Sequence, residues 1–216
     1  MTKTIVKLTL SEQIYNILRD DILAGTIPLG SKLTNRELQE RFQVSSTPVR
    51  DAINRLFQNG LVTNVTKTGA QIISFDPDYA KEINDFISAL ACEAVTQSSQ
   101  KEEQYKIIDE LYQWQKAMID AKDNDSYFQA DVNYHDCFFL HCENRFLIET
   151  YKRYNLLRLL LTQYAIRTPG EKSSTIQQHK AITEAYARGD IDLAKKLVNQ
   201  HYQYGIRQIN EYFQNP

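Results

Sequence analysis

The sequence predicts a mainly α protein with an N-terminal winged helix-turn-helix and a C-terminal all-α bundle of six or seven helices. Residues 9–75 show three short helical patterns followed by two runs of alternating polarity. Beyond residue 78 almost every segment has helical periodicity. With 42% hydrophobic and 24% charged residues, the chain can bury one sizeable core, or two smaller ones, without disulfides.

The first two helices are indicated by their start signals. Thr9 and Glu12 stand at capping-box spacing before an apolar stripe, and Thr34 and Glu37 repeat that spacing before a shorter one. The third helix is predicted in the run "VSSTPVRDAINRLFQNG", which ends at an Asn-Gly pair. The next run, "LVTNVTKTGAQIISF", alternates in polarity, turns and alternates again, which predicts a two-stranded hairpin with residues 67–69 at its tip.

This order of elements is that of a winged helix-turn-helix, whose helix after the turn enters the DNA major groove by its N-terminal end. Ser46, Thr47 and Arg50 share one face of that helix through i+3 and i+4 spacing, so they can meet phosphates and base edges together. The alternative is that Ser45 or Thr47 only caps the helix and that Arg50 pairs with an acidic neighbour in solvent.

Charge supports a division of the chain into a DNA-binding domain, residues 1–75, and an all-helical domain, residues 76–216. The first part has nine Lys and Arg against six Asp and Glu, while the second has 16 against 21.

Three cysteines without CxxC spacing favour a reducing compartment, and the opening MTKTIVKLTL lacks the apolar run of a signal peptide. We therefore expect a cytoplasmic protein with no membrane partner.

The second part is expected to contain helices near 78–98, 101–122, 125–141, 145–166, 173–188 and 190–213. Asp131 and His135 are four residues apart, which places both side chains on one face of a helix. Such a pair can bind one metal ion.

Two further histidines are predicted to lie level with each other. His179 lies ten residues before Gly189 and His201 lies eleven after Asp190, so an antiparallel fold-back at these turn residues brings the two rings to the same height. Asp131, His135, His179 and His201 could then form one site for a divalent metal. The alternative is three independent core or surface histidines, and His141 is assigned a structural role.

The N-terminal run "IYNILRDDILAGTIPLGSKLTNRELQERFQVSSTPVRDAINRLFQNGLV" resembles the GntR-type bacterial transcription regulators over roughly residues 8–75. Where many members carry an arginine after the serine, this chain has Ser46. The resemblance implies a set of DNA-contacting residues, to which the helix spacing adds Ser46: Arg36, Ser45, Ser46, Thr47, Arg50, Lys67 and Gly69.

The C-terminal part resembles the ligand-sensing FCD domain of the FadR-like branch of that family. Its metal-binding members share the pattern of one Asp-x-x-x-His and one histidine on each of the last two helices, which implies the ligands Asp131, His135, His179 and His201. Nitrogen and oxygen ligands without thiolate suit Zn, Ni, Fe or Mn. Residues 79–98 lack the arginine that holds the effector carboxylate in many members.

Such a set leaves open coordination positions that a small carboxylate effector could fill. Arg153 and Arg158 are candidates for its second anionic group, although an ordinary surface or inter-helix salt bridge is the favoured alternative for each. We expect a transcriptional regulator that binds a pseudo-palindromic double-stranded operator as a homodimer. The alternatives are a metal sensor without an organic effector and a metal-dependent enzyme. The predicted winged helix argues against the enzyme, because an enzyme would have no use for it.

Overall fold

The computed structural model describes residues 8–102 and 104–214. It divides into two compact units, of which the first ends at Ser74 and the second begins at Phe75. No helix within the described residues is long and apolar enough to span a membrane. The first seven residues of the MTKTIVKLTL segment, on which the cytoplasmic expectation partly depends, lie outside the described residues.

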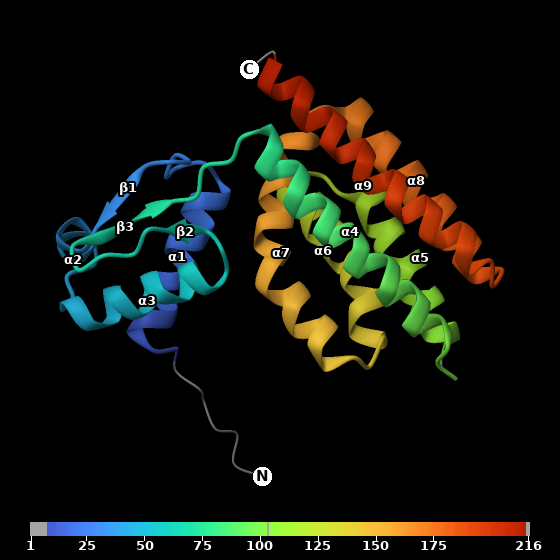
Figure 1. The fold of residues 1–216 in the computed structure, drawn as a ribbon, viewed down its shortest axis with the longest axis horizontal. Helices are drawn as coiled ribbons and strands as arrows, with labels where there is room; N and C mark the ends of the chain where they lie inside the picture. The colour runs from blue at the N-terminus through green and yellow to red at the C-terminus, as the bar shows by residue number, and fades with distance from the viewer. Residues whose placement is uncertain (1–7, 103, 215–216) are drawn as a thin grey trace, which may run out of the picture. The chain divides into compact units, whose positions relative to one another are not determined.

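The first unit has the winged helix-turn-helix fold that the sequence predicts (Figure 1). Its elements are α1 (Leu10–Leu23), β1 (Lys32–Thr34), α2 (Asn35–Phe42), α3 (Ser46–Gln58), β2 (Val62–Thr63) and β3 (Gly69–Ile72). The Thr9 hydroxyl accepts from the Glu12 N–H while the Glu12 carboxylate accepts from the Thr9 N–H, so this capping box is complete. The helices then bury Leu18, Ile53 and Leu56 in a common core.

The sheet has one strand more than the sequence predicts. The hairpin of β2 and β3 is confirmed, with Val62 opposite Ile72, but β1 adds to the other edge of β3 in an antiparallel order β1-β3-β2. Three residues are too few to show alternation, and their partner strand lies far along the chain, so local sequence gave no signal for β1. Thr34 caps α2 by accepting from the Glu37 N–H, and the Glu37 carboxylate accepts from the Thr34 hydroxyl at 2.6 Å, so the predicted capping box lacks its reciprocal bond from the Thr34 N–H.

Within the described residues the second unit contains six helices, which resolves the predicted six or seven in favour of six. They are α4 (Pro77–Ser99), α5 (Gln104–Asp120), α6 (Asn124–His141), α7 (Arg145–Ala165), α8 (Pro169–Ala187) and α9 (Ile191–Gln214). The Asp76 carboxylate accepts from the Tyr79 N–H at 2.8 Å and Pro77 is the first residue of α4, so the Asp-Pro-Asp segment starts this helix.

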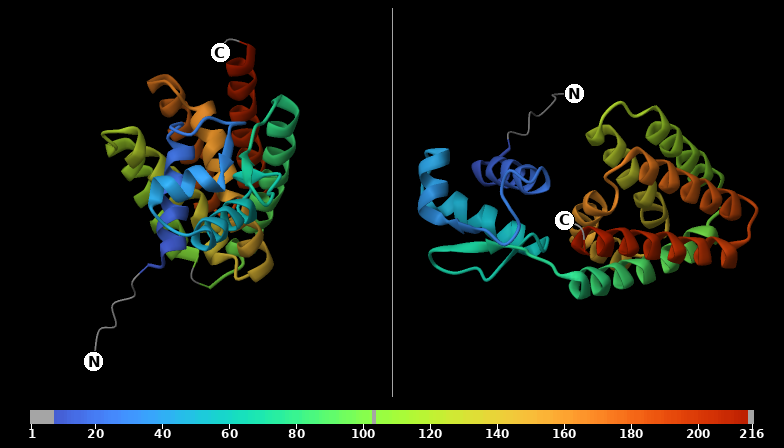
Figure 2. Two further views of the ribbon diagram at one scale, coloured as in Figure 1. Left: turned by 90° about the vertical axis from the view of Figure 1, so that its left-hand side faces the viewer. Right: turned by 90° about the horizontal axis from the view of Figure 1, so that it is seen from above.

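The fold of the second unit brings α6, α8 and α9 together around one point. Helix α6 carries nine buried residues, among them Asp131 and His135. Helices α8 and α9 form an antiparallel pair that turns at Gly189, whose φ of +75° fits the left-handed end of α8, and the pair lies side by side in both sets of views (Figures 1 and 2). The turn predicted at residues 189 and 190 is therefore confirmed.

Candidate metal centre and nucleic-acid interface

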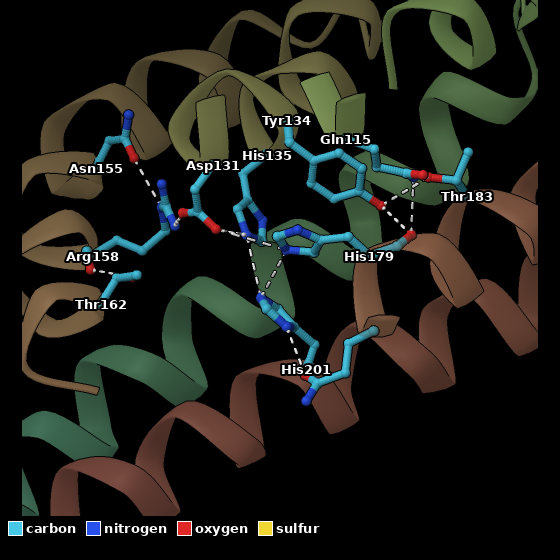
Figure 3. A network of polar contacts seen from close by, with 11 residues as sticks. Gln115, Asp131, Tyr134, His135, Asn155, Arg158, Thr162, His179, Thr183 and His201 are labelled. Atoms are coloured by element: carbon cyan, nitrogen blue, oxygen red, sulfur yellow. Dashed lines mark hydrogen bonds and ion pairs between the residues drawn. The ribbon is translucent and has the colours of Figure 1, made fainter. Parts of the chain in front are cut away.

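Three histidine rings from α6, α8 and α9 meet in the second unit (Figure 3). The Nε2 atom of His201 lies 3.3 Å from Nε2 of His135 and 3.4 Å from Nε2 of His179. His135 and His179 are buried and His201 is partly buried. The convergence predicted from the positions of His179 and His201 about the turn is correct, and the three rings do not occupy independent places.

Asp131 approaches the same point from the turn of α6 that precedes His135. Its Oδ1 atom lies 3.9 Å from Nε2 of His135 and 3.8 Å from Nε2 of His179, and this buried oxygen has no hydrogen-bond partner. The other oxygen, Oδ2, accepts from Nη1 of Arg158 at 3.1 Å. Arg158 is only 4% exposed, so the ion pair is a buried one.

These distances fit the binding of one metal ion. Two ligands at about 2.1 Å from an ion lie about 3.0 Å apart at a right angle and about 3.4 Å apart at a tetrahedral angle. The separations around His201, 3.3 and 3.4 Å, lie in that range, and Oδ1 of Asp131 is an unsatisfied acceptor at a slightly greater distance. The three histidine nitrogens could hold a divalent ion, and Oδ1 of Asp131 is the nearest candidate for a further oxygen ligand.

Side chains that the sequence did not single out hold His179 in place. Its backbone carbonyl accepts from the Tyr134 hydroxyl at 3.0 Å and from the Gln115 amide at 3.3 Å, and both groups also bond to the Thr183 hydroxyl. The Tyr134 ring stacks on the His179 ring with centroids 4.1 Å apart. Nothing in the local pattern distinguishes these residues from ordinary core positions.

Burial keeps the histidines neutral. Desolvation, with the nearby positive charge of Arg158, lowers the pKa of His179 to about 3. Desolvation and the neighbouring His179 lower the pKa of His201 to about 3, and desolvation sets the pKa of His135 well below its usual value. Neutral imidazole is the form that binds metal, so the centre is in its ligand state at neutral pH.

The metal-free protein should therefore lose stability as the pH falls below 6.5. The unfolded histidines, with a pKa of about 6.5, take up protons that the folded ones refuse down to about pH 3. The free energy of unfolding should decrease by roughly 1.4 kcal/mol per pH unit for each histidine in this window. Urea unfolding between pH 7 and 5, with a chelator present, measures the slope. The His179→Gln variant should reduce the slope, because it removes one of the histidines whose pKa burial lowers.

His141 lies away from this cluster. Its Nε2 atom pairs with Oε2 of Glu110 at 3.1 Å, and it is not among the three grouped histidines.

Of the two arginines predicted to meet an effector, Arg158 lines a cavity together with Asp131, His201 and Tyr202. Arg153 is exposed beside the Tyr154 ring and does not line that cavity.

In the first unit, the residues expected to contact DNA lie at the start of α3, on α2 and in the loop between β2 and β3. Ser45 is the N-cap of α3, yet its side chain makes no capping bond. Arg50 is exposed and forms no ion pair with the described residues. Arg36 pairs with Glu40 at 2.9 Å, but its side chain remains 88% exposed, and such surface pairs are weak.

The wing loop carries Lys67, which is exposed, and is followed by Gly69 in β3. A Cβ atom on Gly69 would lie 2.0 Å from the carbonyl oxygen of Leu33, so close packing of β1 on β3 requires glycine there. The side-chain amide of Asn35, which the sequence analysis did not single out, donates to the Lys67 carbonyl at 2.9 Å and ties the wing loop to the start of α2.

A winged helix-turn-helix followed by a separate all-helical unit is typical of a two-domain DNA-binding regulator. The family model for bacterial regulatory proteins of the gntR family matches residues 10–72, and the FCD domain model matches residues 82–204. The chain belongs to the GntR family of transcriptional regulators, in the FadR-like branch with an FCD domain. It is a regulator and not an enzyme.

Relatives share this organisation over nearly their whole length. The HTH-type transcriptional repressor RspR of Escherichia coli (strain K12) is 26% identical over 209 residues, which cover 93% of this chain and 90% of RspR. A GntR transcriptional regulator from Rhodococcus sp. RHA1 has the same fold, with a TM-score of 0.74 at 18% identity over 93% of this chain and 97% of its own. The FCD domain of TM0439, described as metal-free, matches 66% of this chain and 99% of its own with a TM-score of 0.52 at 16% identity.

Proposed function

We propose that residues 76–216 bind a divalent metal together with a small carboxylate, and that this binding changes the affinity of residues 1–75 for a DNA operator. The observation that carries the proposal is the convergence of three histidine rings, with the unpartnered Oδ1 atom of Asp131 3.9 and 3.8 Å from the Nε2 atoms of His135 and His179. The description of the TM0439 FCD domain as metal-free is consistent with a domain that has a metal-bound form.

The cavity beside the centre supports an anionic ligand. Asp131, Arg158, His201 and Tyr202 line it. The Nη2 atom of Arg158 and the hydroxyl of Tyr202 are buried there without hydrogen-bond partners among the described residues. A guanidinium and a phenol both donate, so they suit the oxygens of a carboxylate. We assign the effector's anionic group to Arg158.

A bound divalent ion would supply an electrophilic centre whose open positions attract an oxygen ligand. The protein's own part is to orient the ligands: Arg158 fixes the Asp131 carboxylate, and the Tyr134 and Gln115 side chains hold His179 through its carbonyl. Zn, Ni, Fe and Mn all suit this ligand set. A metal sensor without an organic effector uses the same residues and differs only in what changes operator affinity.

Operator titrations distinguish the two forms of the proposal. Purified protein loaded with metal is titrated with operator DNA in the presence and absence of a panel of small mono-, di- and tricarboxylic acids. A change in operator affinity that requires both metal and acid supports the proposal. A response to metal alone would favour the sensor without an organic effector.

For the DNA-binding unit we propose that Ser45, Ser46, Thr47 and Arg50 enter the major groove and that Arg36 and the wing around Lys67 and Gly69 contact the phosphates. Two observations near the start of α3 support this assignment. Arg50 is exposed and forms no ion pair with the described residues, and the hydroxyl of the N-cap residue Ser45 makes no capping hydrogen bond. A homodimer on a pseudo-palindromic operator would place two such helices in successive major grooves.

Arg50→Ala is expected to weaken operator binding by roughly 1–3 kcal/mol and to relax sequence specificity, because an arginine that contacts a base edge contributes to discrimination. Lys67→Ala should instead weaken binding to all sequences alike and reduce the salt dependence, because it removes a phosphate contact. Titrations of both variants at two salt concentrations measure these effects. Unchanged binding in both folded variants would contradict the assignment.

A further inference from the structure

The side chain of Gln178 reaches from α8 to the back of the His201 ring on α9. Its Oε1 atom lies 2.9 Å from Nδ1 of His201, on the side of the ring opposite the centre. The Nε2 atom of the same ring lies 3.3 and 3.4 Å from the Nε2 atoms of His135 and His179. The His201 ring is thus held between an amide oxygen at one nitrogen and the histidine cluster at the other.

An amide oxygen can only accept a hydrogen bond, so this contact requires the proton of neutral His201 to be on Nδ1. The lone pair is then on Nε2, where it points at the centre. A histidine whose proton lies on Nε2 would have to move it before the ring could bind a metal. We propose that Gln178 is a positioning residue that fixes the tautomer and the orientation of His201 before the metal arrives.

Among the three histidines, His201 is the one whose ring orientation depends most on such a hydrogen-bond partner. His135 and His179 are buried, so neighbouring side chains limit the rotation of their rings, whereas His201 is partly buried. Among the described residues, it is also the one of the three whose Nδ1 has a hydrogen-bond partner; Nδ1 of His179 is buried without one. Partners that accept from the distal N–H of a ligand histidine strengthen metal binding about 10–100-fold.

The position of Gln178 makes the inference testable without disturbing the core. Gln178 and His201 line a groove between α8 and α9 that also includes Gln177, Gln200 and Gln203. Gln177 is an exposed neighbour of the same chemical type in the same groove, and no hydrogen bond joins it to a ligand histidine. It provides a matched control.

This inference rests on the metal site proposed above, and the experiment separates the two. The full-length wild type and the variants Gln178→Ala, Gln178→Glu and Gln177→Ala are titrated with Zn²⁺ and Co²⁺ against a competing chelator. We expect Gln178→Ala to bind about 10–100-fold more weakly. Gln178→Glu, which keeps an accepting oxygen, should bind as tightly as wild type or tighter, and Gln177→Ala should match wild type. Equal affinities of wild type and Gln178→Ala would overturn the inference and leave the metal site intact.

The second measurement needs no metal. Nitrogen-15 chemical shifts of the His201 ring in the metal-free protein report which nitrogen carries the proton. We expect the Nδ1–H form in wild type and in Gln178→Glu, and a mixture of tautomers in Gln178→Ala. If wild type binds no metal, the proposed metal site is wrong, while this measurement still decides whether Gln178 sets the tautomer. A His201 ring protonated at Nε2 in wild type would overturn the inference by itself.

Discussion

Replacing His179 or His201 by alanine is expected to abolish tight metal binding. Each change removes one of the Nε2 atoms that meet within the cluster, and the remaining atoms do not enclose the ion. Because a structural Zn²⁺ site with four ligands binds with about 10–16 kcal/mol, the loss of one ligand should weaken binding about a hundredfold or more. Elemental analysis of the purified variants, followed by chelator competition, measures the effect.

The control is His141→Ala, which should bind metal as wild type does because His141 pairs with Glu110 away from the cluster. Operator binding without effector should survive in all three variants, since the recognition helix belongs to the other unit. The response of operator binding to metal and acid should be lost in the first two, because the sites communicate only through a coupling free energy. Stoichiometric metal in both His179→Ala and His201→Ala would show that these histidines are not ligands.

Much of this centre could be predicted from the sequence because its geometry is regular. Four residues along one helix bring Asp131 beside His135, and equal distances from one turn bring His179 level with His201. Both steps need only the rise and the period of an α-helix. That the two pairs meet depends on how α4, α5 and α7 hold α6 opposite the last two helices, which spacing alone does not give.

The residues that the sequence did not reveal depend on contacts between distant segments. The pairing of β1 with β3 joins residues near Lys32 to residues near Gln71, and three residues carry no pattern of their own. The sequence predicts Arg153 and Arg158 alike as effector contacts, and only the burial of Arg158 against Asp131 distinguishes it from the exposed Arg153. Gln178 differs from Gln177 only in the direction of its side chain, which the tertiary structure sets.

The ion pair of Asp131 and Arg158 is expected to give the largest effects on stability. Both side chains are almost fully buried, and their contact at 3.1 Å is the ion pair that the structure shows for Arg158. Removal of one partner leaves an uncompensated charge in the interior, which typically costs about 3–5 kcal/mol. Asp131→Ala and Arg158→Met should each lower the free energy of unfolding of the metal-free protein by about this amount. The double variant Asp131→Ala, Arg158→Met should lose less than the sum of the two single variants, because it leaves no unpaired charge.

Metal binding should affect the stability of the two single variants differently. One carboxylate oxygen of Asp131 faces the histidine cluster and the other accepts from Arg158. In Arg158→Met the carboxylate keeps its place in the ligand set, so a divalent ion replaces the missing positive charge. Saturating Zn²⁺ should therefore recover most of the lost stability. In Asp131→Ala the ligand itself is gone and Arg158⁺ repels the ion, so recovery should be small. Urea unfolding of both variants with Zn²⁺ and with a chelator measures the difference. Equal recovery in the two variants would mean that Asp131 serves only as the partner of Arg158 and does not bind the metal.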